Sequence, residues 1–382
     1  MQNRRATAAT AVAVVVLTAG ALAGSAQAAS TGAGGRHEPT QRALDAAVRD
    51  GVPGVVARVR DGHRVWRGTA GVGDRNTGRP RTPVDRFRIA SITKTFVSTV
   101  LLQLESEGRL DLDDTVEEWL PGVVRGHGND GAKTTVRQLL NHTSGIFDYI
   151  QDEEYVGKLF GKGFLRHRYD TWTPEQLVAL AMEHRPDFAP GAGWKYSNTG
   201  YVLAGMVIEK VTGHSYADAI EQRVIAPLGL RATTLPGTDV TMPRPSGRAY
   251  SKLFLDDGPV YDVTELNPSA AGASGSMISD AADLNRFYSA LLGGELLPPA
   301  QLKEMKTVVP NQSQDPQNGY GLGIEGVRLP CGVVVWGHAG DIHGSHADGY
   351  STADGRHSLA VNFNGDWAGD AGRIIEAEFC GG

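Results

Sequence analysis

Long runs of one charge sign and long apolar runs are both missing from most of this 382-residue chain. Its 37 basic and 43 acidic residues give a formal net charge of −6, and no block of lysine and arginine stands out. Binding along a nucleic-acid backbone needs clustered positive charge and is therefore not expected. Beyond the N-terminus no apolar run is long enough to cross a bilayer, so no stable membrane anchor is expected either.

Several common catalytic signatures are also absent. The sequence contains no GxSxG elbow, no GxxxxGK[ST] phosphate loop and no HExxH pair. These absences give no support to an α/β-hydrolase serine site, a nucleoside triphosphate site or a zinc peptidase site. We expect no metal and no cofactor.

What is present is the composition of a globular protein, with 41% hydrophobic and 21% charged residues. At the N-terminus Arg4 and Arg5 precede an apolar run over about residues 8–23, and this run ends in Ala26, Gln27 and Ala28. Residues 1–28 therefore resemble a secretory signal, because a membrane anchor would need a longer, more apolar run and a basic flank. We predict export and release outside the cell as a monomer, with residues 29–36 as a flexible leader before one domain over residues 37–382.

Cysteine is rare, with Cys331 and Cys380 as its only positions. In an oxidising compartment a lone pair in a secreted chain most often forms one disulfide. A catalytic thiol or a metal ligand is the alternative, but neither cysteine has a histidine or second cysteine at a ligand spacing. A bond closing a loop of about 50 residues would stabilise the fold by ~4 kcal/mol in the chain-entropy model.

Apolar periodicity predicts strands at both ends of the chain and helices between them. The segments 54–60 and 63–68 read as a hairpin through Asp61 and Gly62, and strands return at 319–323, 331–337, 346–352 and 356–363. Helices are predicted over these residues: 38–50, 91–108, 134–140, 173–184, 198–212, 216–228, 281–292 and 371–379. We therefore expect an α+β fold: one antiparallel sheet built from about 37–109 and 305–382, with an inserted helical region over about 110–304.

The first chemical signal is an SxxK spacing, Ser91 to Lys94, at the start of an apolar helix. Residues three apart share one helix face, so the ammonium group can reach the hydroxyl. In an apolar setting the lysine can lose its proton and act as a base, or keep it and polarise the serine. A capping serine beside a solvated lysine is the structural alternative.

Two further spacings follow in the chain. Tyr196 is the only tyrosine with an asparagine two places later, Asn198, and it lies in a glycine-rich loop before a helix. His338 is the only histidine or lysine with a glycine two places later, Gly340, at the end of a predicted strand. Each alone has a structural explanation as a packed, capping or surface residue, but three such elements in this order favour a catalytic set.

Taken together, these motifs resemble the penicillin-binding, active-site serine hydrolases. That family includes class C β-lactamases and the secreted D-alanyl-D-alanine carboxypeptidases of actinomycetes. The resemblance runs over most of the chain after the leader, and its fold agrees with the expected sheet and helical region. It is carried by these segments and residues: 87–94, 139–145 (LLNHTSG), 196–198, 320–322, 336–340, Cys331 and Cys380.

The resemblance implies a role for each matched residue. Ser91 would be the acylated nucleophile and Lys94 its activating partner, with Tyr196 carrying a proton to the leaving group. Asn198 would hold Lys94 and the substrate amide, and His338 stands where relatives carry lysine or histidine. The backbone N–H groups of Ser91 and of the residue after Gly340 would form the oxyanion hole. His142 is expected to be structural, and the cysteine pair looks like the disulfide of those carboxypeptidases.

The chain departs from the carboxypeptidases where they hold the substrate's terminal carboxylate. Hydroxyl residues and an arginine are replaced by Ala339, Asp341 and Glu325, and Arg328 is close but out of register. An aromatic residue that such enzymes present to the substrate is replaced by Ala270. The expected substrate-binding positions are Ala339, Gly340, Asp341 and Glu325.

From these patterns we expect a serine-type D-alanyl-D-alanine carboxypeptidase that acts on peptidoglycan-type D-peptides. The alternatives are a D-stereospecific aminopeptidase, amidase or esterase of the same family, or an inactive relative that binds penicillin or peptidoglycan. The expected partners are a peptide or ester substrate containing a D-amino acid, and β-lactams as inhibitors. Whether water or an amine takes the acyl group, and whether Lys94 or Tyr196 is the base, stays open.

Overall fold

A computed structural model describes residues 35–255, 257–309, 315 and 317–381. The predicted signal peptide and nearly all of the leader lie outside these residues. No helix among the described residues is long and apolar enough to cross a membrane.

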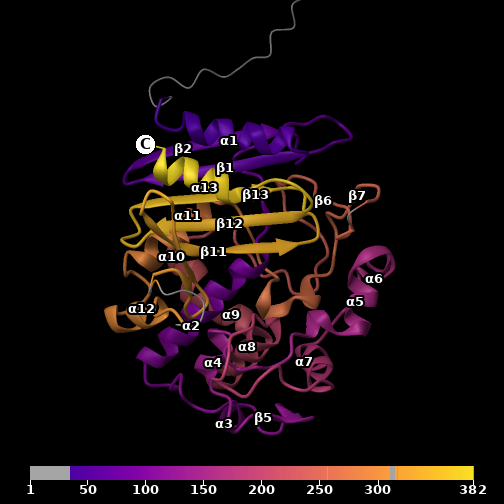
Figure 1. Cartoon of the computed structure of the whole chain (residues 1–382), viewed down its shortest axis with the longest axis vertical. Coiled ribbons are helices and arrows are strands. Elements are labelled where there is room, and N and C mark those ends of the chain that lie inside the picture. The colour runs from indigo at the N-terminus through magenta and orange to yellow at the C-terminus, as the bar shows by residue number, and fades with distance from the viewer. Residues whose placement is uncertain (1–34, 256, 310–314, 316, 382) are drawn as a thin grey trace, which may run out of the picture. The chain divides into compact units, whose positions relative to one another are not determined.

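The main sheet has seven strands in the order β2-β1-β13-β12-β11-β10-β9, and every neighbouring pair is antiparallel (Figure 1). Its strands come from both ends of the chain: β1 (Gly54–Asp61), β2 (Arg64–Gly71), β9 (Gly319–Tyr320), β10 (Glu325–Arg328), β11 (Val334–Ile342), β12 (Ser345–Thr352) and β13 (His357–Phe363). The join between the two ends is the β1–β13 pair, in which Val55 lies opposite Phe363. The α+β fold class expected from the sequence is confirmed.

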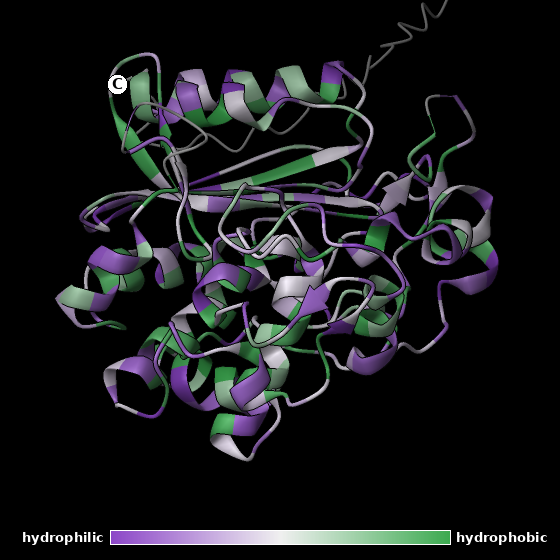
Figure 2. Cartoon of the chain, turned by 60° about the horizontal axis from the view of Figure 1, so that its bottom comes forward, coloured by the Kyte–Doolittle hydropathy of each residue, from purple (hydrophilic) through white to green (hydrophobic). Residues whose placement is uncertain are grey.

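One face of the sheet is covered by the first and last helices, α1 (Glu38–Arg49) and α13 (Ala371–Cys380). Figure 2 shows the sheet nearly edge-on, with α1 on one side and most helices on the other. Apolar residues alternate along the strands, so one set, which includes Val55 and Leu359, packs against these two helices. The disulfide between Cys331 and Cys380 ties the end of α13 to the turn before β11, as predicted.

A buried polar cluster also joins α1 to α13. The carboxylate of Glu378 accepts a hydrogen bond from Thr40 Oγ1 at 2.7 Å and lies 3.0 Å from His37 Nδ1 and 2.8 Å from His357 Nε2. Burial alone would raise the pKa of Glu378, but these hydrogen bonds hold it below its usual value. The N-terminal helix, the C-terminal helix and β13 are therefore fastened together at one carboxylate.

The other face of the sheet packs on the buried helices α11 (Ala281–Leu292) and α2 (Thr93–Ser106). Eleven of the residues of α2 are buried, which agrees with the expected apolar helix. The inserted region holds the other helices: α3 (Val116–Trp119), α4 (Val136–Leu140), α5 (Glu153–Leu159), α6 (Phe164–His167), α7 (Pro174–Met182), α8 (Asn198–Thr212), α9 (Tyr216–Ile220), α10 (Ala226–Leu228) and α12 (Pro299–Met305).

Short elements complete the chain. The 3-10 turns are η1 (Ala90–Ile92), η2 (Tyr149–Gln151), η3 (Gly161–Gly163), η5 (Pro268–Ala270) and η6 (Gly272–Ser274), and η4 (Glu221–Ile225) is a π-helical turn. Three two-stranded sheets pair β3 (Phe87–Arg88) with β8 (Ile278–Ser279), β4 (Arg125–Gly126) with β5 (Asn129–Asp130), and β6 (Tyr250–Ser251) with β7 (Tyr261–Asp262).

One predicted strand was placed wrongly, and the error matters for the site. The segment 331–337 was expected to be a strand, but Gly332, at φ +85°, lies in the turn between β10 and β11. The strand instead begins at Val334 and continues through His338 and Gly340 to Ile342. Glycine has a low strand propensity, so the sequence predicted that the strand would end at Gly337. Pairing with β12 instead extends the strand to Ile342. The third motif therefore lies inside a strand.

Candidate active site

The SxxK motif lies where the turn η1 meets α2. Ala90, directly before Ser91, has a φ of +44°, a strained value for a residue with a Cβ. The turn leaves Ser91 partly exposed at a cavity, while Lys94, one turn further on, is fully buried. The nucleophile candidate is therefore accessible and its partner is not.

Lys94 makes three hydrogen bonds. Its Nζ donates to Ser91 Oγ at 3.0 Å, to Asn198 Oδ1 at 2.8 Å and to the backbone oxygen of Ser274 at 2.8 Å. Burial lowers the pKa of Lys94 to about 7, against the opposing charge of Asp148. A neutral amine has two N–H groups for the two carbonyl oxygens, which leaves its lone pair facing Ser91 Oγ. The arrangement can accept a proton from the serine near neutral pH.

Asp148 is a member of this network that the motifs did not indicate. Asn198 Nδ2 donates to Asp148 Oδ2 at 3.0 Å, so the amide links the carboxylate to Lys94. Burial raises the pKa of Asp148 to about 6, while Lys94 and Asn198 oppose that rise. Asp148 follows the LLNHTSG segment by three residues, but no spacing in the sequence ties it to Asn198.

Tyr196 lies beside the serine and the lysine. Its ring centroid is 4.8 Å from Lys94 Nζ. Burial raises the pKa of Tyr196 well above its usual value, although a hydrogen bond with Ser91 works in the other direction. The phenol therefore keeps its proton at neutral pH and can donate it.

His142 is structural in its contacts, as the sequence suggested. Its Nδ1 accepts a hydrogen bond from the backbone N–H of Ser197 at 3.2 Å, and its ring lies 4.2 Å from that of Tyr196. Burial lowers the pKa of His142 well below its usual value. The neutral ring holds the loop that carries Tyr196.

The third motif faces the same cavity from β11. His338 is buried, and its Nε2 lies 2.9 Å from the hydroxyl of Tyr320 on β9. Burial lowers the pKa of His338, while the nearby Glu325 opposes that shift. Glu325 in turn accepts a hydrogen bond from Tyr350 at 2.5 Å. Tyr320 and Tyr350 are contacts that the sequence did not indicate.

Gly340 brings β11 against the serine turn. A Cβ on Gly340 would lie 2.2 Å from the backbone oxygen of Ile89 and 2.8 Å from the backbone nitrogen of Ser91. Only glycine fits such an approach. Among the described residues β10 pairs with β11 only over Val334–Gly337, so the edge that follows is free and lines the cavity.

Asp341, next along this edge, does not carry an uncompensated charge. Its side chain is 63% exposed, and its Oδ1 lies 2.6 Å from Nδ1 of His346, whose Nε2 is 2.8 Å from Asp348. Burial disfavours a charged His346, but the two carboxylates raise its pKa to about 10. Arg328, the nearby arginine, is exposed and paired with Asp315 instead, so it does not line the cavity. Within the described ranges, no arginine at this edge takes the place of the carboxylate-binding arginine of the carboxypeptidases.

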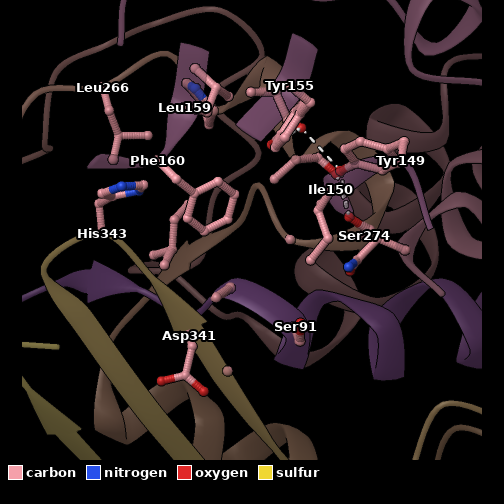
Figure 3. Close-up of a pocket in the computed structure, with 18 of the residues that line it drawn as sticks. Ser91, Tyr149, Ile150, Tyr155, Leu159, Phe160, Leu266, Ser274, Asp341 and His343 are labelled. Carbon is pink, nitrogen blue, oxygen red and sulfur yellow. Dashed lines mark hydrogen bonds between the residues drawn. The ribbon is translucent and has the colours of Figure 1, made fainter. Parts of the chain in front are cut away.

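The cavity has a volume of about 530 Å³, and its apolar arm is the part lined by Leu159, Phe160 and Leu266 (Figure 3). In the figure Phe160, Leu266 and His343 lie together on one side, Tyr149 and Ser274 lie on another, and Ser91 is below them. The backbone oxygen of Ala270 accepts hydrogen bonds from Tyr149 and Tyr155, both at 3.0 Å. These tyrosines supply aromatic surface near the position where Ala270 was expected to remove it.

The structure thus brings the expected catalytic residues together. Lining the cavity are Ser91, Tyr196, Asn198, Glu325, His338, Ala339, Gly340 and Asp341, and Lys94 lies directly beneath. The disulfide lies elsewhere, behind the sheet. Within the described ranges no group of three or more histidine, cysteine or acidic residues is arranged to hold a metal ion.

Comparison with known proteins agrees with this geometry. A family model described as Beta-lactamase matches residues 40–372. The chain belongs to the beta-lactamase family. The resemblance predicted from the motifs is confirmed, and the family is one of serine hydrolases that includes penicillin-binding proteins.

Two solved structures and one curated relative show where the chain stands in the beta-lactamase family. A D-stereospecific amidohydrolase from Streptomyces sp. is 62% identical, with a TM-score of 0.87 over 91% of this chain and 99% of that one. A D-amino acid amidase from Ochrobactrum anthropi SV3, complexed with D-phenylalanine, is 30% identical, with a TM-score of 0.76 over 89% and 98%. Penicillin-binding protein 4* of Bacillus subtilis (strain 168) is 30% identical over 252 residues, 62% of this chain and 52% of that protein. The chain spans about half of the length of the curated relatives it matches.

Proposed function

We propose that the protein is a D-stereospecific amidohydrolase that cleaves amides or esters of D-amino acids through an acyl-enzyme on Ser91. The observation that carries this proposal is the pair of acidic residues beside the third motif, of which only Glu325 lacks an ion-pair partner among the described residues. Glu325 and Asp341 stand where a carboxypeptidase needs groups that bind a carboxylate, while the serine and lysine are fully hydrogen-bonded for acylation. The 62% identity to the Streptomyces D-stereospecific amidohydrolase also supports this proposal. The alternative is therefore better supported than a D-alanyl-D-alanine carboxypeptidase.

The reaction would run in two steps. Ser91 Oγ attacks the substrate carbonyl as its proton passes to neutral Lys94, and the oxyanion is held by the backbone N–H groups of Ser91 and Asp341. Tyr196 gives its proton to the leaving amine or alkoxide and regains one from Lys94. Water then attacks the acyl-enzyme by the reverse proton path, which releases the D-amino acid and restores the serine hydroxyl.

The apolar arm suits the side chain of the substrate. Phe160, Leu266 and Tyr149 offer apolar surface to a large group, whereas a D-alanine methyl would leave most of the arm empty. The relative solved with D-phenylalanine supports a large apolar D-amino acid as the acyl part. We therefore propose that D-phenylalanine amide and D-phenylalanine esters are good substrates.

A hydrolysis panel tests this function. Wild type and Ser91→Ala are assayed with D-phenylalanine amide, D-phenylalanine methyl ester, the L-enantiomers of both, and an acyl D-Ala-D-Ala peptide. We expect hydrolysis of the D-amide and D-ester, at least about 100-fold slower cleavage of the L-enantiomers, and no turnover by Ser91→Ala. A free-acid D-Ala-D-Ala peptide as the best substrate would restore the carboxypeptidase interpretation.

We also propose that residues 1–28 direct export and that the released protein acts as a monomer outside the cell. The disulfide supports an oxidising compartment. Mass spectrometry of the protein from its producing cells should find it in the medium with an N-terminus near Ala29. An intact Met1 in a cell-bound protein would contradict export, and light scattering would reveal an oligomer.

A further inference from the structure

The cavity is lined by three carboxylates, and only one of them lacks a cationic partner among the described residues. Asp341 lies 2.6 Å from His346, and Asp170 lies 2.8 Å from His167. Glu325 makes no ion pair with a lysine, arginine or histidine of the described ranges, and its hydrogen bond comes from the neutral hydroxyl of Tyr350. Among the described residues, Glu325 is therefore the cavity-wall carboxylate without an ion-pair partner, and the basic group it acts on is His338, whose lowered pKa it opposes.

Gly337 is what holds this carboxylate in place. On the sheet Gly337 lies between Glu325 of β10 and Tyr350 of β12, directly opposite both. A Cβ on Gly337 would lie 2.7 Å from Cδ1 of Tyr350, so only glycine lets the tyrosine reach across to Glu325. The result is a half-buried carboxylate with a fixed position at the point where the free edge of β11 begins.

This point is the leaving-group side of the site. Tyr196, which would protonate the leaving group, has its ring centroid 6.4 Å from that of His338 and 6.1 Å from that of Tyr320. Tyr320 lies opposite Glu325 in the β9–β10 pair. The apolar arm of the cavity, lined by Phe160 and Leu266, would take the acyl side chain.

We infer that Glu325 is a specificity-determining residue that selects leaving groups carrying a positive charge. The inference rests on the proposed function and extends it to the amine that is released. An amide formed with a diamine, or with an amino acid amide that has a basic side chain, would place its ammonium group against Glu325. A leaving group that ends in a carboxylate would be repelled by the same charge.

Three substrates of equal length test the selection. They are D-phenylalanine amides of pentylamine, 1,4-diaminobutane and 5-aminopentanoic acid, whose chains of four methylene groups differ only in ending in a methyl, an ammonium or a carboxylate. For wild type we expect kcat/KM for the cationic amide to exceed that of the neutral one by about tenfold, and the anionic amide to be about tenfold worse. In Glu325→Gln both ratios should fall to within about twofold of one, because the amide keeps the size and loses the charge.

Two further variants make the test specific. Glu376→Gln removes an exposed carboxylate on the outer surface of α13 and should keep the wild-type ratios. Tyr350→Phe leaves Glu325 charged but frees it to rotate, so it should reduce both ratios by about threefold, and it serves if Glu325→Gln fails to fold. Equal kcat/KM for the three amides in wild type, or ratios that survive in Glu325→Gln, would overturn the inference about Glu325 and leave the proposed function standing. Absence of turnover on D-phenylalanine amide itself would overturn the proposed function and this inference with it.

Discussion

Gly340 lies so close to Ser91 that a methyl group on the glycine would come within 2.8 Å of the serine's backbone nitrogen. That nitrogen belongs to one of the two N–H groups proposed to hold the oxyanion. The edge of β11 and the turn that carries Ser91 therefore fix each other's position. The gap between them leaves no room for a side chain larger than that of glycine at position 340.

Gly340→Ala should impair catalysis more than folding. The added Cβ would lie 2.2 Å from the backbone oxygen of Ile89, so the turn and β11 would have to move apart by about 1 Å. Misplaced oxyanion donors cost about 100-fold in kcat. The measurement is kcat on D-phenylalanine amide beside a thermal melt. Gly157→Ala, where an added Cβ meets no atom within 4 Å and which does not line the cavity, is the matched control with little expected loss. Full activity in Gly340→Ala would contradict the proposed oxyanion site.

Ser91 should form a covalent acyl-enzyme. Incubation with a labelled penicillin or an activated D-aminoacyl ester, followed by peptide mass spectrometry, should locate the adduct on Ser91. Tyr196→Phe should lose at least about 100-fold in rate, because it cannot pass a proton to the leaving group. An adduct on another serine, or activity in Ser91→Ala, would refute the mechanism.

The pH dependence of kcat/KM should report Lys94. With its pKa lowered to about 7 by burial, the lysine is protonated below that pH and cannot take the serine proton, so the rate should fall toward acid. Asp148 opposes that shift, so Asp148→Asn removes a nearby negative charge, lowers the pKa of Lys94 further and moves the acidic limb to lower pH. Comparing both enzymes on one substrate cancels the substrate's own titration. A limb that stays in place, or moves to higher pH, would exclude Lys94 as the titrating base.

Asp341 should disfavour a substrate with a free carboxylate by less than its charge alone suggests. A free-acid D-Ala-D-Ala peptide should be a worse substrate than its amide or methyl ester, but His346 offsets much of the repulsion from this exposed carboxylate. Asp341→Thr should therefore narrow the preference for the amide by only about threefold. The comparison is kcat/KM for the three peptides in both enzymes. A free acid that is best in wild type and unaffected by the substitution would show that the charge plays no part.

The disulfide should brace the sheet without entering the chemistry. Thiol titration of denatured, unreduced protein should find no free thiol. Replacing both Cys331 and Cys380 by serine should lower the stability by up to ~4 kcal/mol, with kcat close to that of wild type. Two titratable thiols would show that the bond does not form in the protein as produced.

Contacts between residues that follow one another closely could be predicted from helical geometry, whereas the distant residues Tyr196 and His338 were linked to Ser91 only through the resemblance of their motifs to a known family. Ser91 and Lys94 are three residues apart on one helix, so their contact follows from helical geometry alone. The two-ended sheet also followed from the positions of the apolar strands. Asp148 could not be linked to Asn198, because their contact depends on how two distant loops pack.

Charge balance was the least predictable feature. With β11 expected to end at Gly337, the sequence offered no partner for Asp341. The pairing of β11 with β12 sets His346 opposite Asp341 and sets Tyr350 beside Glu325, and both contacts depend on strand register. The uncompensated charge therefore lies at Glu325 and not at Asp341.

The pairing of Val55 with Phe363 has a consequence for how the protein matures. The first hairpin cannot complete its sheet until more than three quarters of the chain has been synthesised, so it must wait for the C-terminal strands. An incomplete chain would thus expose the apolar faces of β1 and α1. Stable folding would require the last helix, α13, to be present. Progressive truncation from the C-terminus should abolish folding abruptly when α13 is removed, rather than shortening a stable core.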